Sequence, residues 1–390
     1  MIPAAFLTTG YEAGAERRAA QAFEVRAIAA VSSVLALQLA AFGLAWDIVW
    51  HTNVGRDRFL TVPHVLLYFG IGLAGIVMLA AVLYETVHFH AGAPTPGTTQ
   101  FLGVFHASRG LYVTGFGLLA TALAAPLDNY WHELYGIDVT IWAPFHVMGL
   151  SGSAITVVGL LYVLAALANV ARPRARTVLG YNLYEWLAFL VLAGGCALTY
   201  VLSEPGMRQV PRVGSGLLGF LPTPVICAFG MTLCVVTAIA FIGRAEAGAV
   251  VIGVYLVRQA VFNVLAPALT RQSVAAHAIG YRISGFEPHV DGLVVVITLT
   301  LIPAALFFAV ARERAASLWA GAIGGALFGL GTYLWVAAAQ GQQVPLPGVA
   351  APLDAVALRT AFLPTLALAA AAGALAAYLG GGFGRLLKAE

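Results

Sequence analysis

The chain has 390 residues, of which 61% are hydrophobic and only 9% are charged. Soluble domains carry about 25% charged residues, so this composition excludes an ordinary soluble domain and indicates an integral protein of the lipid bilayer. The net charge of +3 comes from scattered basic residues, which argues against nucleic acid as a partner. The polar N-terminus lacks the apolar core of a signal peptide, so the first apolar segment is expected to remain as a membrane anchor.

Apolar stretches of about 20 residues, the length that crosses a bilayer, recur along the whole chain. They predict an all-α polytopic membrane helix bundle of about ten transmembrane helices, at 27–46, 63–84, 107–127, 143–170, 181–202, 217–242, 248–267, 292–311, 316–338 and 360–380. We divide the chain into a cytoplasmic N-terminal segment, a four-helix half and a six-helix half of unassigned role, at residues 1–26, 27–170 and 171–390.

The arginines beside the spans predict the orientation, because cytoplasmic loops carry an excess of Lys and Arg. Arginines precede the first expected span and follow the fourth, sixth and eighth, as at Arg26, Arg172, Arg244 and Arg312. This pattern places both termini in the cytoplasm. The connections after the first, third and seventh spans then lie at the outer face of the plasma membrane.

The first outer connection is "WDIVWHTNVGRDRFLTVPH", which follows an apolar span directly. Asp47 and His51 are four residues apart, so at a helix end they share one face. His64 comes thirteen residues later, after Pro63, in the first turn of the next span. The flanking tryptophans suggest an aromatic belt at the membrane interface.

The second outer connection, "LDNYWHELYGIDVTIWAPFH", repeats this arrangement. Asp128 and His132 are again four apart, and His146 follows fourteen residues later after a proline. Each connection also carries a further acid, Asp57 or Asp138, six residues past its first histidine. Four of the six aspartates and four of the nine histidines of the chain lie in these two short stretches.

Two histidines and one carboxylate form a ligand set for copper, zinc or non-haem iron, with a position left for water or substrate. Charged groups at membrane depth are costly, and a bound cation would satisfy several of them at once. Asp57 and Asp138 are expected to orient the histidines or relay protons. The alternative is that these residues only cap helix ends at the interface, but two clusters with matching spacing favour metal binding.

The segment "WHTNVGRDRFLTVPHVLLYF" resembles the outer-face segment of one integral-membrane subunit of the copper membrane monooxygenases, the particulate methane and ammonia monooxygenase family. That segment carries Asp-x3-His-x12-His with Arg-Asp in between, matched here by Asp47, His51 and His64. The second connection resembles the neighbouring site of the family and ends in "APFH", but Asp128 stands where the family usually has Asn. The resemblance covers about residues 27–170 and implies copper as the metal.

Several other polar residues have competing interpretations. Glu287, His289 and Asp291 in "GFEPHVDG" are expected on the outer face, as a further ligand, a proton relay or a solvated loop, with His277 upstream. His88 and His90 fall on the inner face and are interpreted as interfacial polar residues. Arg258 lies inside the seventh span, where a charge is costly, and either pairs with a carboxylate or marks a later helix start. The remaining group is interpreted as small core residues, namely Cys196, Cys227 and Cys234.

Three functions are compatible with the sequence. The first is oxidation of a small apolar molecule with O2 at copper, which needs an electron donor and, by the resemblance, other membrane monooxygenase-like subunits. The second is copper uptake, storage or delivery without catalysis, with a periplasmic copper donor as partner. The third is a structural or assembly role within a larger membrane complex. Transport predicts a polar path through the membrane, yet only Arg258 and Asn263 lie deep in a span.

Overall fold

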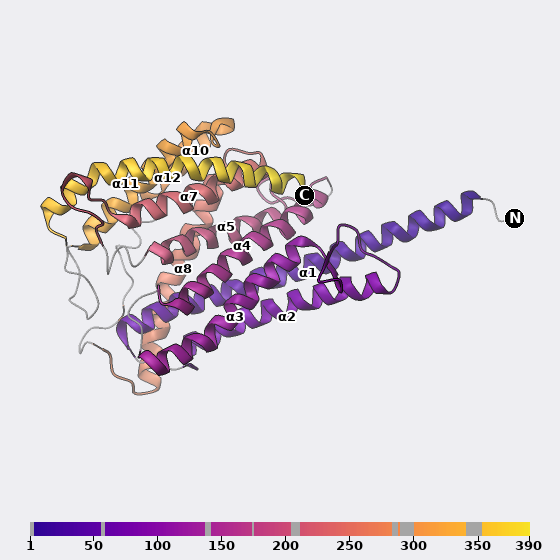
Figure 1. Cartoon of the computed structure of the whole chain (residues 1–390), viewed down its shortest axis with the longest axis horizontal. Coiled ribbons are helices and arrows are strands. Elements are labelled where there is room, and N and C mark those ends of the chain that lie inside the picture. Colours follow the sequence, from indigo (N-terminus) through magenta and orange to yellow (C-terminus); the bar gives the residue numbers. More distant parts are fainter. Residues whose placement is uncertain are drawn as a thin grey trace.

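The computed structural model of the chain describes residues 4–55, 59–136, 142–173, 175–203, 211–282, 288, 300–340 and 353–390. In these residues the chain is almost entirely helical, and its one sheet is a hairpin of two three-residue strands. The all-α prediction is therefore confirmed. Figure 1 shows the long helices lying side by side in one bundle.

The N-terminal half of the bundle consists of two helical hairpins, α1–α2 and α3–α4. Prolines in the first turns of α2 and α4 suit positions where the backbone N–H would have no helical partner. Gly136, with φ of 86°, caps the end of α3 in a conformation that favours glycine. The bounds are α1 Ala4–Asn53, α2 Val62–His90, β1 Thr99–Phe101, β2 Phe105–Ala107, α3 Arg109–Tyr135 and α4 Pro144–Ala171.

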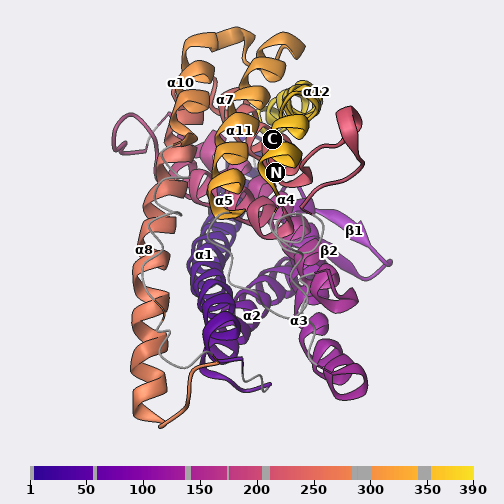
Figure 2. The same ribbon diagram turned by 90° about the vertical axis from the view of Figure 1, so that its left-hand side faces the viewer.

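The C-terminal half is arranged around α7 (Pro222–Ile242), which packs against α5, α8, α11 and α12. Of its apolar window 72% is buried, against 22% for α8. Helix α5 contacts both α4 and α7 and so joins the two halves, while α8 runs along one flank beside α1 (Figure 2). The other bounds are α5 Leu183–Ser203, η1 Gly216–Leu218, α8 Ala247–Ala276, α10 Ile302–Ala311, η2 Arg312–Arg314, α11 Leu318–Gln340 and α12 Ala355–Ala389.

Nine helices of the described chain are long and apolar enough to cross a membrane. They coincide with nine of the ten expected spans, although α1 begins far earlier than the apolar pattern indicated. The remaining expectation was a span over 292–311. Its second half forms the apolar helix α10, and residues 289–299 lie outside the described residues.

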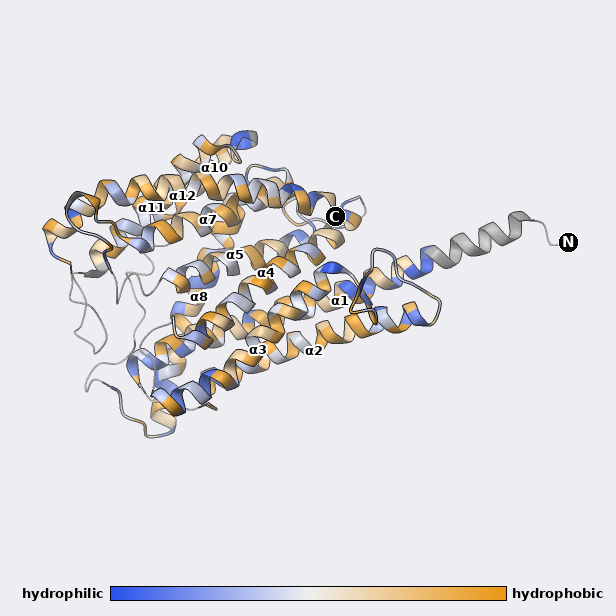
Figure 3. Cartoon of the chain, viewed as in Figure 1, coloured by the Kyte–Doolittle hydropathy of each residue, from blue (hydrophilic) through white to orange (hydrophobic). Residues whose placement is uncertain are grey.

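The outer surface of the bundle is apolar in its middle and polar at its two ends. Large hydrophobic side chains such as Ile28, Ile76, Leu79 and Val257 are more than half exposed. Figure 3 shows hydrophobic residues along the helices, with hydrophilic ones concentrated near the helix ends. A contiguous exposed apolar belt would aggregate in water, so this surface is in contact with the lipid bilayer.

Two buried ion pairs, which the sequence analysis did not identify, fasten the end of the bundle that carries both termini. Glu85 of α2 is fully buried, accepts from Arg26 Nε at 2.6 Å, and also accepts from the backbone N–H of Ser108. Glu185 of α5 has the same environment, with Arg172 Nε at 2.8 Å and the Asn182 N–H. Each carboxylate is satisfied on both oxygens, which offsets its burial.

Arg258, deep in α8, has a different set of partners from the one expected. Its guanidinium donates to the amide oxygens of Gln38 and Gln259 and lies 4.4 Å from the ring centroid of Phe262. Its described contacts are therefore with neutral amides and an aromatic ring rather than a carboxylate. The three cysteines are free and buried, in agreement with their interpretation as core residues.

Candidate metal centres

Both Asp/His clusters lie at one end of the bundle, opposite to the N- and C-termini. Helix α1 ends where α2 begins, and α3 ends where α4 begins, at the same end of the molecule (Figure 1). The segment after α8 reaches the same end, because the N–H of Arg282 donates to the carbonyl of Asn53 at 2.7 Å. The sequence-based expectation that these polar segments share one surface is therefore confirmed for their described residues.

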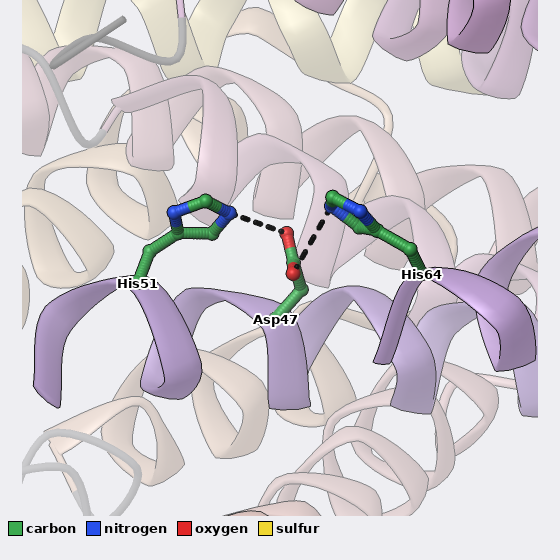
Figure 4. Close-up of side chains that lie close together, drawn as sticks. All are labelled: Asp47, His51 and His64. Atoms are coloured by element: carbon green, nitrogen blue, oxygen red, sulfur yellow. Dashed lines mark ion pairs between the residues drawn. The ribbon is translucent and has the colours of Figure 1, made fainter. Parts of the chain in front are cut away.

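In the first cluster, Asp47 lies between two imidazoles (Figure 4). Nε2 of His51, one turn further along α1, is 3.5 Å from Asp47 Oδ2. Nε2 of His64, from the first turn of α2, is 3.2 Å from Asp47 Oδ1. The His64 ring stacks on Tyr68, with 5.5 Å between centroids. Two helices thus supply one carboxylate and two imidazoles from opposite sides.

The second cluster repeats this geometry at the α3–α4 corner. Nε2 of His132 and Nε2 of His146 each lie 3.2 Å from Asp128 Oδ2. The two ring centroids are 5.9 Å apart, against 6.0 Å for the pair in the first cluster. The matching spacing in the sequence therefore produces matching sites in space.

The distances fit a metal ion in either cluster. In each triad one donor atom per residue lies within 4.8 Å of the other two. Metal–nitrogen and metal–oxygen bonds of about 2.0–2.2 Å place neighbouring donors roughly 3 to 4 Å apart. Both triads are already near that separation, so binding requires only small side-chain rotations.

The hydrogen bonding of His132 strengthens this argument. Its Nδ1 lies 3.1 Å from the carbonyl oxygen of Gly136, which can only accept, so Nδ1 carries the proton. Nε2 of the neutral ring is then an acceptor that faces the carboxylate of Asp128, which is also an acceptor. The pair is stable only with a cation between them, either a second ring proton or a metal ion.

Each central carboxylate also has an oxygen without a hydrogen bond. Asp128 Oδ1 is buried and makes none among the described residues. Asp47 Oδ1 is likewise buried, and His64 lies within ion-pair distance of it but not in hydrogen-bond geometry. Unsatisfied buried carboxylate oxygens are costly, and direct coordination of a cation would satisfy them.

Access to the two centres is one-sided. The side chains of Asp47 and Asp128 are only 12% and 21% exposed, whereas those of His51 and His146 are 32% and 29% exposed. The carboxylate thus forms the floor of each centre and a histidine its open edge. A ligand from water or from the membrane interface would reach the centre past that histidine.

A close helix contact lies just behind each centre. Gly70 and Gly152 each follow the second histidine of their hairpin by six residues. A Cβ on Gly152 would lie 2.7 Å from the Gly117 carbonyl oxygen of α3, and one on Gly70 would collide with the Ala36 carbonyl of α1. Small residues that let backbones approach are typical of membrane helix packing. These glycines set the separation of the helices that carry the ligands.

The tryptophans of the first connection differ from the expectation of an interfacial belt. Trp46 and Trp50 are buried, and the Trp46 indole donates to Thr270 of α8 at 3.1 Å. They fix the end of α1 against α8 because their rings fill the space between the two helices. Trp142, before α4, is 57% exposed and fits the belt.

The other predicted residues are not brought to the centres or fall outside the described chain. Asp57, Asp138, Glu287, His289 and Asp291 lie outside the described residues. His277 is exposed, and its ring contacts the carbonyl of Ser273 in its own helix. His88 and His90 lie at the opposite end, where their rings contact the carbonyls of Tyr84 and Val104. Their interpretation as interfacial polar residues agrees with these contacts.

Comparison of the chain with models of protein families, with curated proteins and with solved structures finds no match. What the fold and the clusters define is a class: a multi-pass helical membrane protein with two groups of residues that have the geometry of metal ligands.

Proposed function

We propose that this protein is a copper-binding membrane protein related to the copper membrane monooxygenases, through the integral-membrane subunit whose motifs it resembles. The single observation that carries the proposal is the pair of Asp-His-His triads, each with its donors within 4.8 Å. A chance interfacial pair of Asp and His would not be expected twice with the same spacing and the same ring separation.

Copper is proposed ahead of zinc and iron on two grounds. The motifs of residues 27–170 resemble those of a copper family, and imidazole-rich sites bind Cu(II) more tightly than other first-row divalent ions. Asp47, His51 and His64 would hold one ion, and Asp128, His132 and His146 the other. The added carboxylate at Asp128 makes the second centre more anionic than its family counterpart.

In its catalytic form the proposal is oxidation of a small apolar molecule. One atom of O2 enters a C–H bond, and the other leaves as water with two electrons and two protons from a donor. Copper supplies the redox chemistry, while this chain holds the ions and leaves an open edge at His51 and His146. Partner proteins of the monooxygenase type would supply the electrons, with the centres facing the outside of the plasma membrane and both termini in the cytoplasm.

The test is the metal content of the purified protein after loading with copper and zinc in competition. We expect two equivalents of copper in the wild type and one in each of the double variants His51→Ala/His64→Ala and His132→Ala/His146→Ala. The matched control, His88→Ala/His90→Ala, removes two histidines from the opposite end and should retain both equivalents. A wild type that binds no metal, or a control that loses as much as the other variants, refutes the proposal.

Catalysis is tested separately, with copper-loaded protein in membranes that contain its natural partners. We expect a hydroxylated product from a small apolar substrate only with O2 and a reductant, and none from either double variant. Transfer of copper to an acceptor under argon, without any product under O2, would favour the delivery function instead.

A further inference from the structure

A second polar site lies at the end of the bundle opposite to the metal centres. It is a pocket of about 320 Å³ between the α4–α5 connection and the α7–α8 turn, lined among others by Arg172, Thr177, Tyr181, Asn182 and Arg244. This volume is at the lower end of the range of small-molecule sites, about 300–1,000 Å³. The pocket lies at the ends of four spans, which is the level of the lipid head groups.

The two arginines of the pocket keep donors in reserve. Arg172 donates Nε to Glu185 and one Nη2 hydrogen to the Phe241 carbonyl. Arg244 donates to Glu246 from Nε and Nη2, and from Nη1 to the Gly180 carbonyl. A guanidinium has five N–H groups, so half of the N–H groups of this pair make no hydrogen bond within the described chain. The fork of donors that remains suits a phosphate group.

Tyr181 provides an independent sign of a missing ligand. The side chain is only 2% exposed, and its hydroxyl makes no hydrogen bond among the described residues. The guanidinium of Arg244 lies 4.2 Å from the centroid of its ring. A buried hydroxyl without a partner is costly, and an anion that enters the pocket beside Arg244 would offer it an acceptor.

The charge around the pocket also favours an anion. Two carboxylates, Glu185 and Glu246, face Arg172 and Arg244, and two further cations lie close by. Arg176 belongs to the connection that forms the pocket wall. The ammonium of Lys388 lies about one van der Waals contact from Gly243, in the turn between α7 and α8. Basic pockets of this kind between membrane helices bind phosphate head groups.

We infer that this pocket binds a phosphate-bearing anion, held by Arg172, Arg244 and the Tyr181 hydroxyl. The same chemistry has two sources, the head group of an anionic phospholipid and a free phosphate ester. The site is independent of the metal centres, because it lies at the other end of the bundle and shares no residue with them.

The experiment uses the full chain, stripped of lipid in detergent, and two probes. Native mass spectrometry measures binding of phosphatidylglycerol, and calorimetric titration measures binding of glycerol 3-phosphate, the same chemistry without acyl chains. We expect one equivalent to bind. Arg244→Gln should weaken it about tenfold or more, because one charged hydrogen-bonding partner contributes at least about 1.5 kcal/mol. Tyr181→Phe keeps the ring and should weaken binding several-fold.

The matched control is Arg385→Gln, which removes the same charge from an exposed position of α12 that does not line the pocket. It should bind as the wild type does. Binding of phosphatidylglycerol alone identifies a lipid site, and binding of glycerol 3-phosphate as well identifies a soluble ligand. Absence of binding for both probes overturns the inference. Equal losses in Arg385→Gln and Arg244→Gln overturn it too, because they would reflect only the net charge of this face.

Discussion

The glycine behind the second metal centre offers the sharpest test of how packing positions the ligands. In Gly152→Ala the new methyl group would lie 2.7 Å from the Gly117 carbonyl oxygen and 2.5 Å from the Thr121 hydroxyl of α3. An ordinary contact is about 3.4 Å or more, so the backbones must separate by about 0.7 Å. This position is six residues, or about 9 Å, from His146 along α4.

We expect Gly152→Ala to lower the free energy of unfolding by about 1–2 kcal/mol. Overpacking of a tight contact costs about 1–3 kcal/mol, and the helical preference of Ala over Gly returns about 0.5–1 kcal/mol. The widened α3–α4 gap moves His146 away from Asp128, so copper affinity at the second centre should fall roughly tenfold, or about 1.4 kcal/mol. The first centre, on α1 and α2, should be unaffected.

Gly149→Ala is the matched control, one turn closer to the centre on the same helix. Its methyl group would meet only Ala124 Cβ at 3.4 Å, an ordinary contact. Thermal unfolding in detergent and copper binding against a competing chelator report the two effects. The packing argument fails if the two variants behave alike, or if Gly152→Ala weakens both centres equally.

Three further predictions concern the ligands and the buried ion pairs. Asp128→Asn should weaken copper binding at the second centre by roughly tenfold, about 1.4 kcal/mol, because a neutral amide replaces the shared carboxylate; unchanged chelator competition would contradict this. Glu85→Gln should destabilise the protein by about 3–5 kcal/mol, because it leaves Arg26 without its buried partner, whereas Glu246→Gln, in an exposed pair, should cost less than about 1 kcal/mol in the same unfolding assay. Removal of copper by a chelator should lower the melting temperature of the wild type, since metal at 100 times its Kd contributes about 2.7 kcal/mol, but should leave a variant without all four histidine ligands unchanged.

Periodicity and composition were sufficient to predict the fold, because a lipid solvent forces every span to be a long apolar helix. The candidate centres could also be found, since Asp47 and His51 are one helical turn apart and the following proline marks where α2 begins. Local geometry of this kind is readable from spacing alone. The sequence thus predicted which six side chains meet at the two hairpin corners.

Features that depend on contacts between distant helices were not predicted. Glu85 meets Arg26 across 59 residues, and Trp46 meets Thr270 across 224, so no spacing rule connects them. An acid near the end of an apolar helix was the available signal for Glu85, but it does not identify the partner. The partners of Arg258 were missed for the same reason, because amide oxygens on α1 and α8 carry no charge pattern.

Each metal centre takes all its ligands from helices that are neighbours in the chain. The first set is complete within 18 residues and the second within 19, and the glycine that fixes each helix pair follows six residues later. The loop that must close is therefore short, and its entropic cost is small. Each centre can form as soon as its own hairpin has been inserted into the membrane, so metal loading is able to begin while the C-terminal half is still being synthesised.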